Sequence, residues 1–201
     1  MPILRSSPPS PFGRKVKIAA QVAGLYDQLE IVNANTNDPD DNLRTQNVLG
    51  KIPVLMLDDG TALYDSRVIV EWLDDKSGGK LLPAGNDRFD ALVLQALADG
   101  MMDASLLIIY EDRFRPPEMQ FQPWIDYQRE KVARALNRLE EDPPALGDAP
   151  HAGHIALACA LGYLDFRFAG EWRTGYPRLV EWLDGFSDAV PAYAKTAPEA
   201  A

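Results

Sequence analysis

The sequence predicts an α/β amino-terminal domain followed by an all-α carboxy-terminal domain. Residues 1–75 alternate short β-like runs with helical patterns, and a Ser-Gly-Gly-Lys stretch after them has the composition of a linker. Nearly all of the later chain carries apolar residues at helical spacing. A length of 201 residues suits two small domains. We therefore expect domains at residues 1–76 and 87–201, joined by a linker at 77–86.

The first helix follows a short strand at residues 2–5. Ser10 offers a hydroxyl at the N-cap, and Pro11 places a proline at the first helical position; both are typical of a helix N-terminus. Apolar residues then recur at helical spacing, and Gly24 is a typical stop. We expect a helix between Ser10 and Gly24.

Three further strands complete the first domain. One is expected at residues 29–32, and the polar segment 33–47 after it forms a loop or a short irregular helix. Asp59-Gly60 separates β-like runs at 54–57 and 61–64 and is a strong hairpin signal. A parallel pair plus an antiparallel hairpin gives a four-strand mixed sheet.

Helical patterns account for most of the remaining chain. Asp65-Ser66 caps one helix, and Leu81-Leu82-Pro83 is expected to lie pinned across the junction between the domains. A run from 155 to 164 is apolar almost throughout, so that helix should be surrounded on all sides. The other expected helices carry apolar stripes at 89–108, 125–139 and 179–186, the second lying within a helix at about 120–141.

The charge balance limits the classes of partner. The chain has 30 acidic and 20 basic residues, a formal net charge of −10. Phosphate backbones are held mainly by Lys and Arg, so we expect no nucleic acid and no membrane as partner. A small anionic ligand is still compatible, because a local site of oriented amides and one or two cations is enough to bind it.

Cysteine usage and the absence of targeting signals favour a cytoplasmic protein. No apolar run reaches the roughly 18 residues of a spanning helix, and the first residues lack a stretch of signal-peptide type. Cys159 is the single cysteine of the sequence, which excludes an internal disulfide and a Cys-x-x-Cys pair. His151 and His154 have a spacing that could hold a metal, but with no third histidine and no nearby cysteine we expect none.

Four segments, taken in their order along the chain, resemble the glutathione S-transferase family. The strongest is Gly50-Lys51-Ile52-Pro53-Val54-Leu55, followed after the hairpin by Asp65-Ser66. Ser10-Pro11-Phe12 resembles the serine-type active-site start of that family, and residues 158–167 resemble the buried helix of bacterial members. The resemblance covers essentially the whole chain. It implies a thioredoxin-like N-terminal domain, a helical C-terminal domain and glutathione as co-substrate without a further cofactor.

The resemblance implies a glutathione site in the first domain. In the family the proline at Pro53 is cis, which would let Ile52 pair through its N–H and C=O with the cysteinyl unit of glutathione; the alternative is a trans proline on an edge strand. Ser66 and the helix N-terminus would hold the γ-glutamyl carboxylate, and Asp65 the ammonium group. The same two residues also make an ordinary helix cap.

Ser10 is the candidate catalytic residue, with Ser7 as the alternative if the loop register differs and Phe12 as a neighbouring glutathione contact. Its hydroxyl would donate a hydrogen bond to the glutathione sulfur. Lowering a thiol pKa of about 8.5 by about two units requires about 2.7 kcal/mol. A hydrogen bond to a charged group supplies about 1.5–3 kcal/mol, so no general base is needed. The alternative is that Ser10 only caps its helix.

The missing active-site cysteine indicates the reaction class. Family members that reduce mixed disulfides carry a cysteine where Ser10 stands, so thiol transfer is not expected. We expect conjugation of glutathione to a small hydrophobic electrophile, or reduction of a hydroperoxide. The electrophile should lie in the cleft against the first long helix of the second domain, near Met102, Leu106, Tyr110 and Arg113.

Two polar features lie outside these motifs. Gln95, Asp99 and Asp103 form a row on an otherwise apolar helix, which is either solvated or lines the cleft and helps to hold the ligand's amine. The family commonly has a Ser/Thr-x-x-Asp cap before its buried helix. Here the segment is His151-Ala152-Gly153-His154, which puts that cap in doubt.

Members of the family are usually homodimers, and the apolar stripes at 68–73 and 89–108 leave enough surface for one. Two alternatives stay open: a non-catalytic regulatory or scaffold protein of the same fold, and a glutathione-dependent isomerase or dehalogenase. The sequence does not identify the electrophile, nor does it separate detoxification from peroxide defence or a catabolic step.

Overall fold

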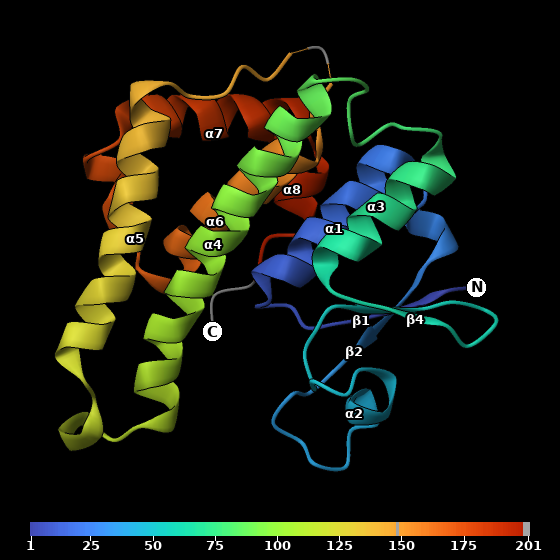
Figure 1. The fold of residues 1–201 in the computed structure, drawn as a ribbon, viewed down its shortest axis with the longest axis horizontal. Helices are drawn as coiled ribbons and strands as arrows, with labels where there is room; N and C mark the ends of the chain where they lie inside the picture. Colours follow the sequence, from blue (N-terminus) through green and yellow to red (C-terminus); the bar gives the residue numbers. More distant parts are fainter. Residues whose placement is uncertain (148, 199–201) are drawn as a thin grey trace.

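The first third of the chain builds a mixed sheet, seen here in a computed structural model that describes residues 1–147 and 149–198. β1 is parallel to β2, whereas β3 is antiparallel to both β1 and β4. This arrangement confirms the predicted four-strand sheet and its hairpin. The strand order is β2-β1-β3-β4, with bounds β1 Ile3–Ser6, β2 Glu30–Asn33, β3 Val54–Met56 and β4 Ala62–Leu63 (Figure 1).

Two helices pack together over the sheet. α1 (Pro11–Ala23) and α3 (Ser66–Ser77) lie side by side in Figure 1 and contact each other. Leu4, Val16 and Ile69 have no exposed surface and join the strand and both helices in one core. The shorter elements of this part are η1 (Tyr26–Gln28), and α2 (Leu43–Gln46), which forms within the polar segment expected to be a loop or short helix.

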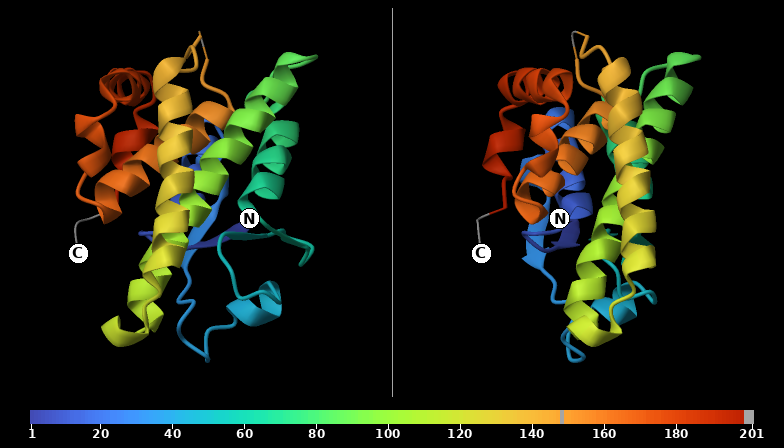
Figure 2. Two further views of the ribbon diagram at one scale, coloured as in Figure 1. Left: turned by 60° about the vertical axis from the view of Figure 1, so that its left-hand side comes forward. Right: turned by 90° about the vertical axis from the view of Figure 1, so that its left-hand side faces the viewer.

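The second part of the described chain is helical, and α6 (Ala152–Arg167) lies at its centre. Every residue from 152 to 164 is buried, which confirms the prediction of a helix surrounded on all sides. α4 (Asp87–Phe114) packs against both α6 and α5 (Gln122–Glu141), and Figure 2 shows α4 and α5 side by side. The remaining elements are η2 (Pro117–Met119), η3 (Glu171–Thr174), α7 (Pro177–Ala189) and α8 (Ala192–Lys195).

Helix α4 is long and apolar enough to cross a membrane by length and composition alone. Its packing against α5 and α6 buries one face of it, on which Ala98 and Met102 have no exposed surface.

Helix α6 also packs against α1, so one hydrophobic core runs through both parts. Gly162 on α6 allows this approach, because a Cβ there would lie 2.6 Å from Nη1 of Arg14 and 2.6 Å from the hydroxyl of Tyr193. This contact fixes the position of α1, at whose N-terminus Ser10 lies. The division into domains at 76 and 87 stays a prediction, since the core does not separate them.

The segment between α3 and α4 is held in place at Leu81 and Leu82, as predicted for Leu81-Leu82-Pro83. The Asp74 carboxylate accepts hydrogen bonds from the Leu81 N–H at 2.7 Å and the Leu82 N–H at 2.9 Å. The Leu81 carbonyl accepts one from the Ala152 N–H at 2.7 Å. α3, the linker and the start of α6 therefore form one connected unit.

Two histidines cap α6. Nδ1 of His151 accepts hydrogen bonds from the N–H groups of Gly153 at 3.1 Å and His154 at 3.4 Å. Nδ1 of His154 accepts from the His151 N–H at 3.3 Å, which completes a capping box. The sequence left this cap in doubt; the structure has it, with imidazole nitrogens as the acceptors.

Candidate functional site

Ser10 is the N-cap of α1. Its Oγ accepts a hydrogen bond from the Gly13 N–H at 3.1 Å, and its own N–H donates to the Ser7 carbonyl at 3.1 Å. The cap expected from the sequence is therefore confirmed. Accepting one hydrogen bond leaves the hydroxyl hydrogen of Ser10 available to a ligand. The side chain is half-buried, so a ligand has access to it.

A small hollow lies beside Ser10. Its volume is about 10 Å³, close to the space that one water molecule needs. α1, α6 and the C-terminal segment all contribute to its wall, so the surroundings of Ser10 are set by both parts of the fold. The lining residues are Pro8, Pro9, Ser10, Pro11, Arg14, Cys159, Gly162, Tyr163 and Pro198.

The Ile52-Pro53 peptide bond is cis, as the family resemblance implied. Pro53 is buried and Ile52 half-buried just before β3. Among the described residues, the N–H and C=O of Ile52 have no main-chain hydrogen-bond partner. Asn47 holds the preceding turn, because its side-chain NH₂ donates to the Lys51 carbonyl at 2.9 Å and its Oδ1 accepts from the Leu49 N–H at 3.0 Å.

Asp65 and Ser66 form the N-terminus of α3. The Asp65 carboxylate accepts from the Arg67 N–H at 2.9 Å and pairs with the Arg67 guanidinium at 2.8 Å. Burial alone would raise the pKa of Asp65, but the hydrogen bonds and charge of Arg67 outweigh it and hold that pKa below its usual value. Ser66 is buried at the first helical position. The peptide bond between Tyr64 and Asp65 is also cis, a feature that the sequence does not signal.

The polar row on α4 faces the first part of the fold. Asp99 is buried and pairs with the Lys15 ammonium of α1 at 2.6 Å, and Nε of Arg67 lies 3.9 Å from its other oxygen. Burial raises the pKa of Asp99 despite the Lys15 charge. Burial of Gln95 as well favours a cleft position for the row over a solvated face. Asp103 is more exposed; burial raises its pKa, and the charges of Lys51 and Arg67 oppose that shift.

The residues expected to contact the electrophile separate into two groups. Met102 has no exposed surface, because that face of α4 is covered within the core, so its prediction as a cleft residue is wrong. Leu106 and Tyr110 are half-buried and Arg113 is exposed, with its guanidinium carbon 5.5 Å from the centre of the Tyr110 ring. Three of the four residues thus have surface that a ligand could reach.

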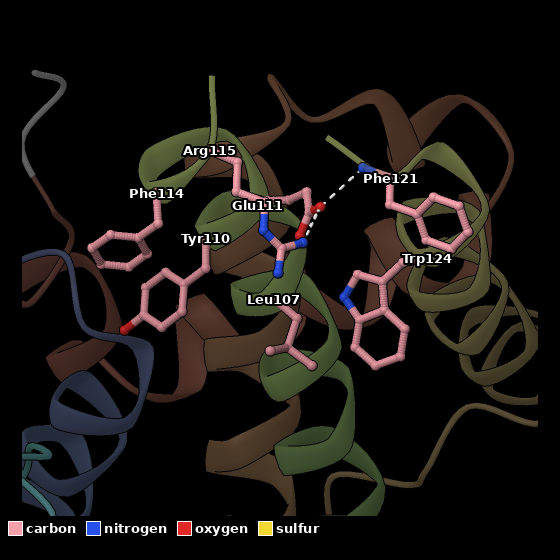
Figure 3. Close-up of a pocket in the computed structure, with 7 residues that line it drawn as sticks. All are labelled: Leu107, Tyr110, Glu111, Phe114, Arg115, Phe121 and Trp124. Atoms are coloured by element: carbon pink, nitrogen blue, oxygen red, sulfur yellow. Dashed lines mark hydrogen bonds and ion pairs between the residues drawn. The ribbon is translucent and has the colours of Figure 1, made fainter. Parts of the chain in front are cut away.

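A larger hollow of about 450 Å³ lies at the C-terminal end of α4 and the start of α5. Figure 3 shows Tyr110 and Phe114 on one side of α4, with Phe121 and Trp124 across from them. Glu111 joins the two sides, because its carboxylate accepts from the Phe121 N–H at 3.0 Å and pairs with Arg115. Of this set, only Tyr110 was predicted from the sequence as a site residue. The signal for the others was the group of aromatic residues around the turn, since Phe114, Phe121 and Trp124 line the hollow together with Leu107.

Comparison with known families gives matches in both parts of the chain. Residues 4–81 match the family model described as Glutathione S-transferase, N-terminal domain. Residues 122–185 match the one described as Glutathione S-transferase, C-terminal domain. A curated relative from Escherichia coli K12, described as the uncharacterized GST-like protein YibF, is 34% identical over 94% of this chain and 95% of its own length.

Solved structures match over the same extent. A glutathione transferase family member from Pseudomonas fluorescens Pf-5 with bound glutathione is 39% identical, has a TM-score of 0.92, and covers 99% of this chain and 100% of its own. A structure of a family member from the same organism holds S-(propanoic acid)-glutathione, with a TM-score of 0.88, 39% identity and the same coverage. A glutathione S-transferase from Methylobacillus flagellatus KT with glutathione bound is 33% identical, has a TM-score of 0.91, and covers 99% of this chain and 100% of its own.

Proposed function

The chain belongs to the glutathione S-transferase family, and from that premise we propose that it stabilises the thiolate of glutathione for attack on a small hydrophobic electrophile or a hydroperoxide. The observation that supports this proposal most strongly is the geometry of Ser10. Its hydroxyl caps α1 as an acceptor and keeps its hydrogen for a sulfur anion placed at the helix N-terminus.

In this proposal, glutathione lies beside the residues just before β3 and the N-terminus of α3. The N–H and C=O of Ile52, which lack a main-chain partner in the described part of the chain, pair with the cysteinyl unit of the tripeptide next to the cis Pro53. Ser66 and the amides of the first turn of α3 hold the γ-glutamyl carboxylate. Asp65, ionised because Arg67 lowers its pKa, attracts the ammonium group.

The second carboxylate near the ammonium group is Asp99, with Asp103 one turn further along α4. The negative charges of both carboxylates act on Arg67, because each of them raises the pKa of its guanidinium group. Phe12, half-buried at the start of α1, completes the contacts on the glutathione side. Relatives at 33% and 39% identity bind glutathione in their crystals, which supports a tripeptide site of this kind here.

The thiolate is stabilised without a general base. A hydrogen bond from Ser10 to the charged sulfur supplies about 1.5–3 kcal/mol, and the N-terminus of α1 adds about 0.3–1 kcal/mol. Lowering the thiol pKa by about two units requires about 2.7 kcal/mol, so the two contributions are sufficient. The glutathione thiolate is the nucleophile, and none is needed from the protein.

Thiol transfer is disfavoured by the state of Cys159. This side chain is fully buried in α6, and burial raises the pKa of its thiol to about 11. A thiol of that pKa is almost entirely protonated at neutral pH and is a poor nucleophile. Conjugation is favoured in turn by the Pseudomonas relative that holds S-(propanoic acid)-glutathione, a molecule with an acid chain on the sulfur.

The electrophile lies against α4 near Leu106, Tyr110 and Arg113, which have surface that a ligand can reach. Half-buried apolar and aromatic surface of this kind binds small hydrophobic molecules. We assign the protein to the cytoplasm and to a detoxifying role, with neither nucleic acid nor membrane as a partner; the net charge of −10 supports the exclusion of polyanions.

In this proposal, two copies of the chain form a homodimer. Helices α3 and α4 expose large apolar side chains in the two stripes expected to be buried between subunits, and the loop before β3 adds two more. Their exposed fractions are Val48 81%, Leu49 67%, Val68 45%, Phe89 68% and Val93 67%. Phe89 and Val93 are four residues apart on α4 and so lie on the same face of the helix, where two exposed apolar side chains of this size favour an interface.

Calorimetric titration with glutathione and with S-hexylglutathione tests the proposal. We expect both to bind, the alkylated form more tightly because its chain enters the apolar cleft beside the sulfur. Ser66→Ala should weaken both by about tenfold through loss of a hydrogen bond to a carboxylate. Ser77→Ala, at the other end of the same helix, is the matched control and should change neither.

Absence of binding by both ligands at millimolar concentration would overturn the proposal. The motif residues would then be caps and turns only, and a non-catalytic scaffold protein would be the better description. If both ligands bind, product analysis with a panel of electrophiles and hydroperoxides distinguishes conjugation and peroxide reduction from isomerisation and dehalogenation.

A further inference from the structure

The turn that leads into Ile52 has little packing of its own. Val48 is 81% exposed and Leu49 67%, and Lys51 is exposed as well. Side chains that face solvent do not fix the path of the backbone to which they belong. The conformation of residues 48–51 therefore has to come from hydrogen bonds.

Asn47 provides these hydrogen bonds. Its Oδ1 accepts from the Leu49 N–H at 3.0 Å, its NH₂ group donates to the Lys51 carbonyl at 2.9 Å, and its own carbonyl accepts from the Gly50 N–H at 2.8 Å. In the described part of the chain, Asn47 is one member of every hydrogen bond made by the backbone of residues 48–51. One residue therefore holds the whole turn.

Asn47 is itself fixed to the sheet through α2. It is buried, and its N–H donates to the Leu43 carbonyl at 2.8 Å at the end of that helix. Leu43 lies in a small apolar cluster with Val54 of β3. The Arg5 guanidinium of β1 donates to Oε1 of Gln46 at 2.8 Å, which ties α2 to the sheet a second time. The turn therefore starts from a rigid position.

The hydrogen bond to the Lys51 carbonyl also sets the direction of the Ile52 N–H. Both groups belong to one planar trans peptide unit, in which the C=O and the N–H point in opposite directions. Because the NH₂ group of Asn47 holds the carbonyl, the N–H is aimed to the other side, and the described main chain offers it no acceptor there. A donor that is oriented before the ligand arrives loses little conformational freedom on binding.

We propose that Asn47 is a positioning residue for glutathione: through the Lys51 carbonyl it orients the Ile52 N–H, which donates to the cysteinyl carbonyl of the tripeptide. The inference rests on the proposed function and deepens it, because it makes that one contact depend on a side chain that does not touch the ligand. An amide suits this role, since the turn needs an acceptor and a donor on the same side chain.

The test is a calorimetric titration with glutathione and with an analogue in which a trans alkene replaces the Cys-Gly amide. The analogue has the shape of the amide without its carbonyl oxygen, so the Ile52 N–H has no acceptor on it. We expect the wild-type protein to bind glutathione about ten times more tightly than the analogue, which is the upper end of the net effect of one hydrogen bond.

Two substitutions of Asn47 remove the donor to the Lys51 carbonyl. Asn47→Asp keeps the acceptor for the Leu49 N–H, and Asn47→Ala removes both groups without adding a charge. Each should reduce the ratio of the two affinities to about twofold or less, and the affinity for the analogue should stay unchanged. That affinity also reports whether the variants fold and keep the rest of the tripeptide site.

The amide NMR signal of Ile52 gives a second readout of the same contact. It should move downfield when the wild-type protein binds glutathione, because the N–H gains an acceptor, and it should move less with the analogue. In both Asn47 variants the shift with glutathione should be reduced. A side chain that only stabilised the fold would leave this shift unchanged in the folded protein.

Asn35→Asp is the matched control. Asn35 is exposed in the same polar segment, and its Oδ1 accepts from the Asn37 N–H at 3.1 Å, two residues further on, as that of Asn47 does from Leu49. The substitution makes the same change of charge in the same kind of turn. It should leave the affinity ratio and the Ile52 signal as they are in the wild type.

The outcomes separate this inference from the function beneath it. An unchanged ratio in both Asn47 variants, or an equal loss of affinity for both ligands, would overturn the positioning role and leave the transferase function standing. Equal binding of the two ligands by the wild type would do the same, because the Ile52 N–H would then contribute nothing. Failure of both ligands to bind the wild type would remove the transferase function and this inference together.

Discussion

The Lys15 ammonium lies 2.6 Å from the Asp99 carboxylate, and both side chains are buried. Lys15 belongs to α1 and Asp99 to α4, so this ion pair joins the two parts of the fold. Arg67, 3.9 Å from Asp99 on its other side, extends the pair to the N-terminus of α3. The proposed glutathione site therefore lies over a charged contact between α1, α3 and α4.

Lys15→Met should destabilise the protein by about 3–5 kcal/mol, because it leaves the buried Asp99 carboxylate without its main partner. The double variant Lys15→Met/Asp99→Leu should recover more than half of that loss. Urea unfolding measures both. Lys76→Met is the control: this exposed lysine pairs with Asp75 at 3.4 Å, and its loss should matter little. Equal stabilities of Lys15→Met and the wild type would contradict the role given to the pair.

Ser10→Ala should raise the pKa of bound glutathione's thiol by about one to two units, because the charged sulfur loses its hydrogen bond. The thiolate absorbance of the complex, followed against pH, measures this directly. Loss of the hydrogen bond from the Gly13 N–H to the capping Ser10 hydroxyl should lower the free energy of unfolding by only about 1 kcal/mol. Ser7→Ala is the comparison, and a thiolate that survives in Ser10→Ala but not in Ser7→Ala would transfer the role to Ser7.

Local signals in the sequence predicted most of the elements. Ser10-Pro11 begins α1, Gly24 ends it in the left-handed conformation (φ 75°), and Asp59-Gly60 makes the hairpin. Each of these depends on neighbours within a few residues. The strand boundaries were less accurate: β4 is only two residues long, Ala62–Leu63.

Contacts between distant segments could not be predicted in this way. Helical spacing indicated that Met102 and Leu106 share a face of α4, but not that other helices cover Met102 completely. Lys15 and Asp99 are 84 positions apart, and no local pattern connects them. The roles of Ile52, Asp65 and Ser66 toward glutathione stay predictions, because they depend on a ligand.

Asp65→Asn should weaken glutathione binding by about tenfold, because the ligand's ammonium loses an ionised partner. A second titration of the wild type and of Asp65→Asn uses a glutathione analogue without the amino group. The affinity for this analogue should be the same for both proteins. Asp59→Asn in the hairpin turn is the control, since Asn-Gly suits the same turn. An equal loss of affinity for both ligands would show that Asp65 acts through the helix cap instead.

The wild-type protein should elute in gel filtration at about twice its 22.3-kDa mass. Val93→Glu places a charge within the exposed apolar stripe of α4 and should shift the protein to the monomer, because an unpaired charge is costly in an interface. Met119→Glu, at an equally exposed residue outside the stripe, should not. A wild type that elutes only as a 22.3-kDa species contradicts the dimer.

The histidine cap of α6 should make the protein less stable in mild acid. Burial, with a smaller effect of His151, lowers the pKa of His154 from 6.5 to about 4. Between these two values the folded state binds fewer protons than the unfolded state, so stability rises with pH across the window. The contribution is complete above about pH 6.5, and about 2 kcal/mol of it should be lost by pH 5.

Burial is the main physical cause, because a charged imidazole is costly away from water, and protonation also removes a hydrogen-bond acceptor. A protonated Nδ1 of His154 can no longer accept from the His151 N–H, and the added charge lies at the positive end of α6, beside a second imidazole 3.6 Å away. Urea unfolding at pH 7.5 and pH 5 measures the difference. His151→Ser/His154→Asp restores a Ser-x-x-Asp cap whose carboxylate stays ionised at pH 5, and it should remove most of the dependence. If the variant and the wild type lose the same stability between these pH values, other groups must cause the loss.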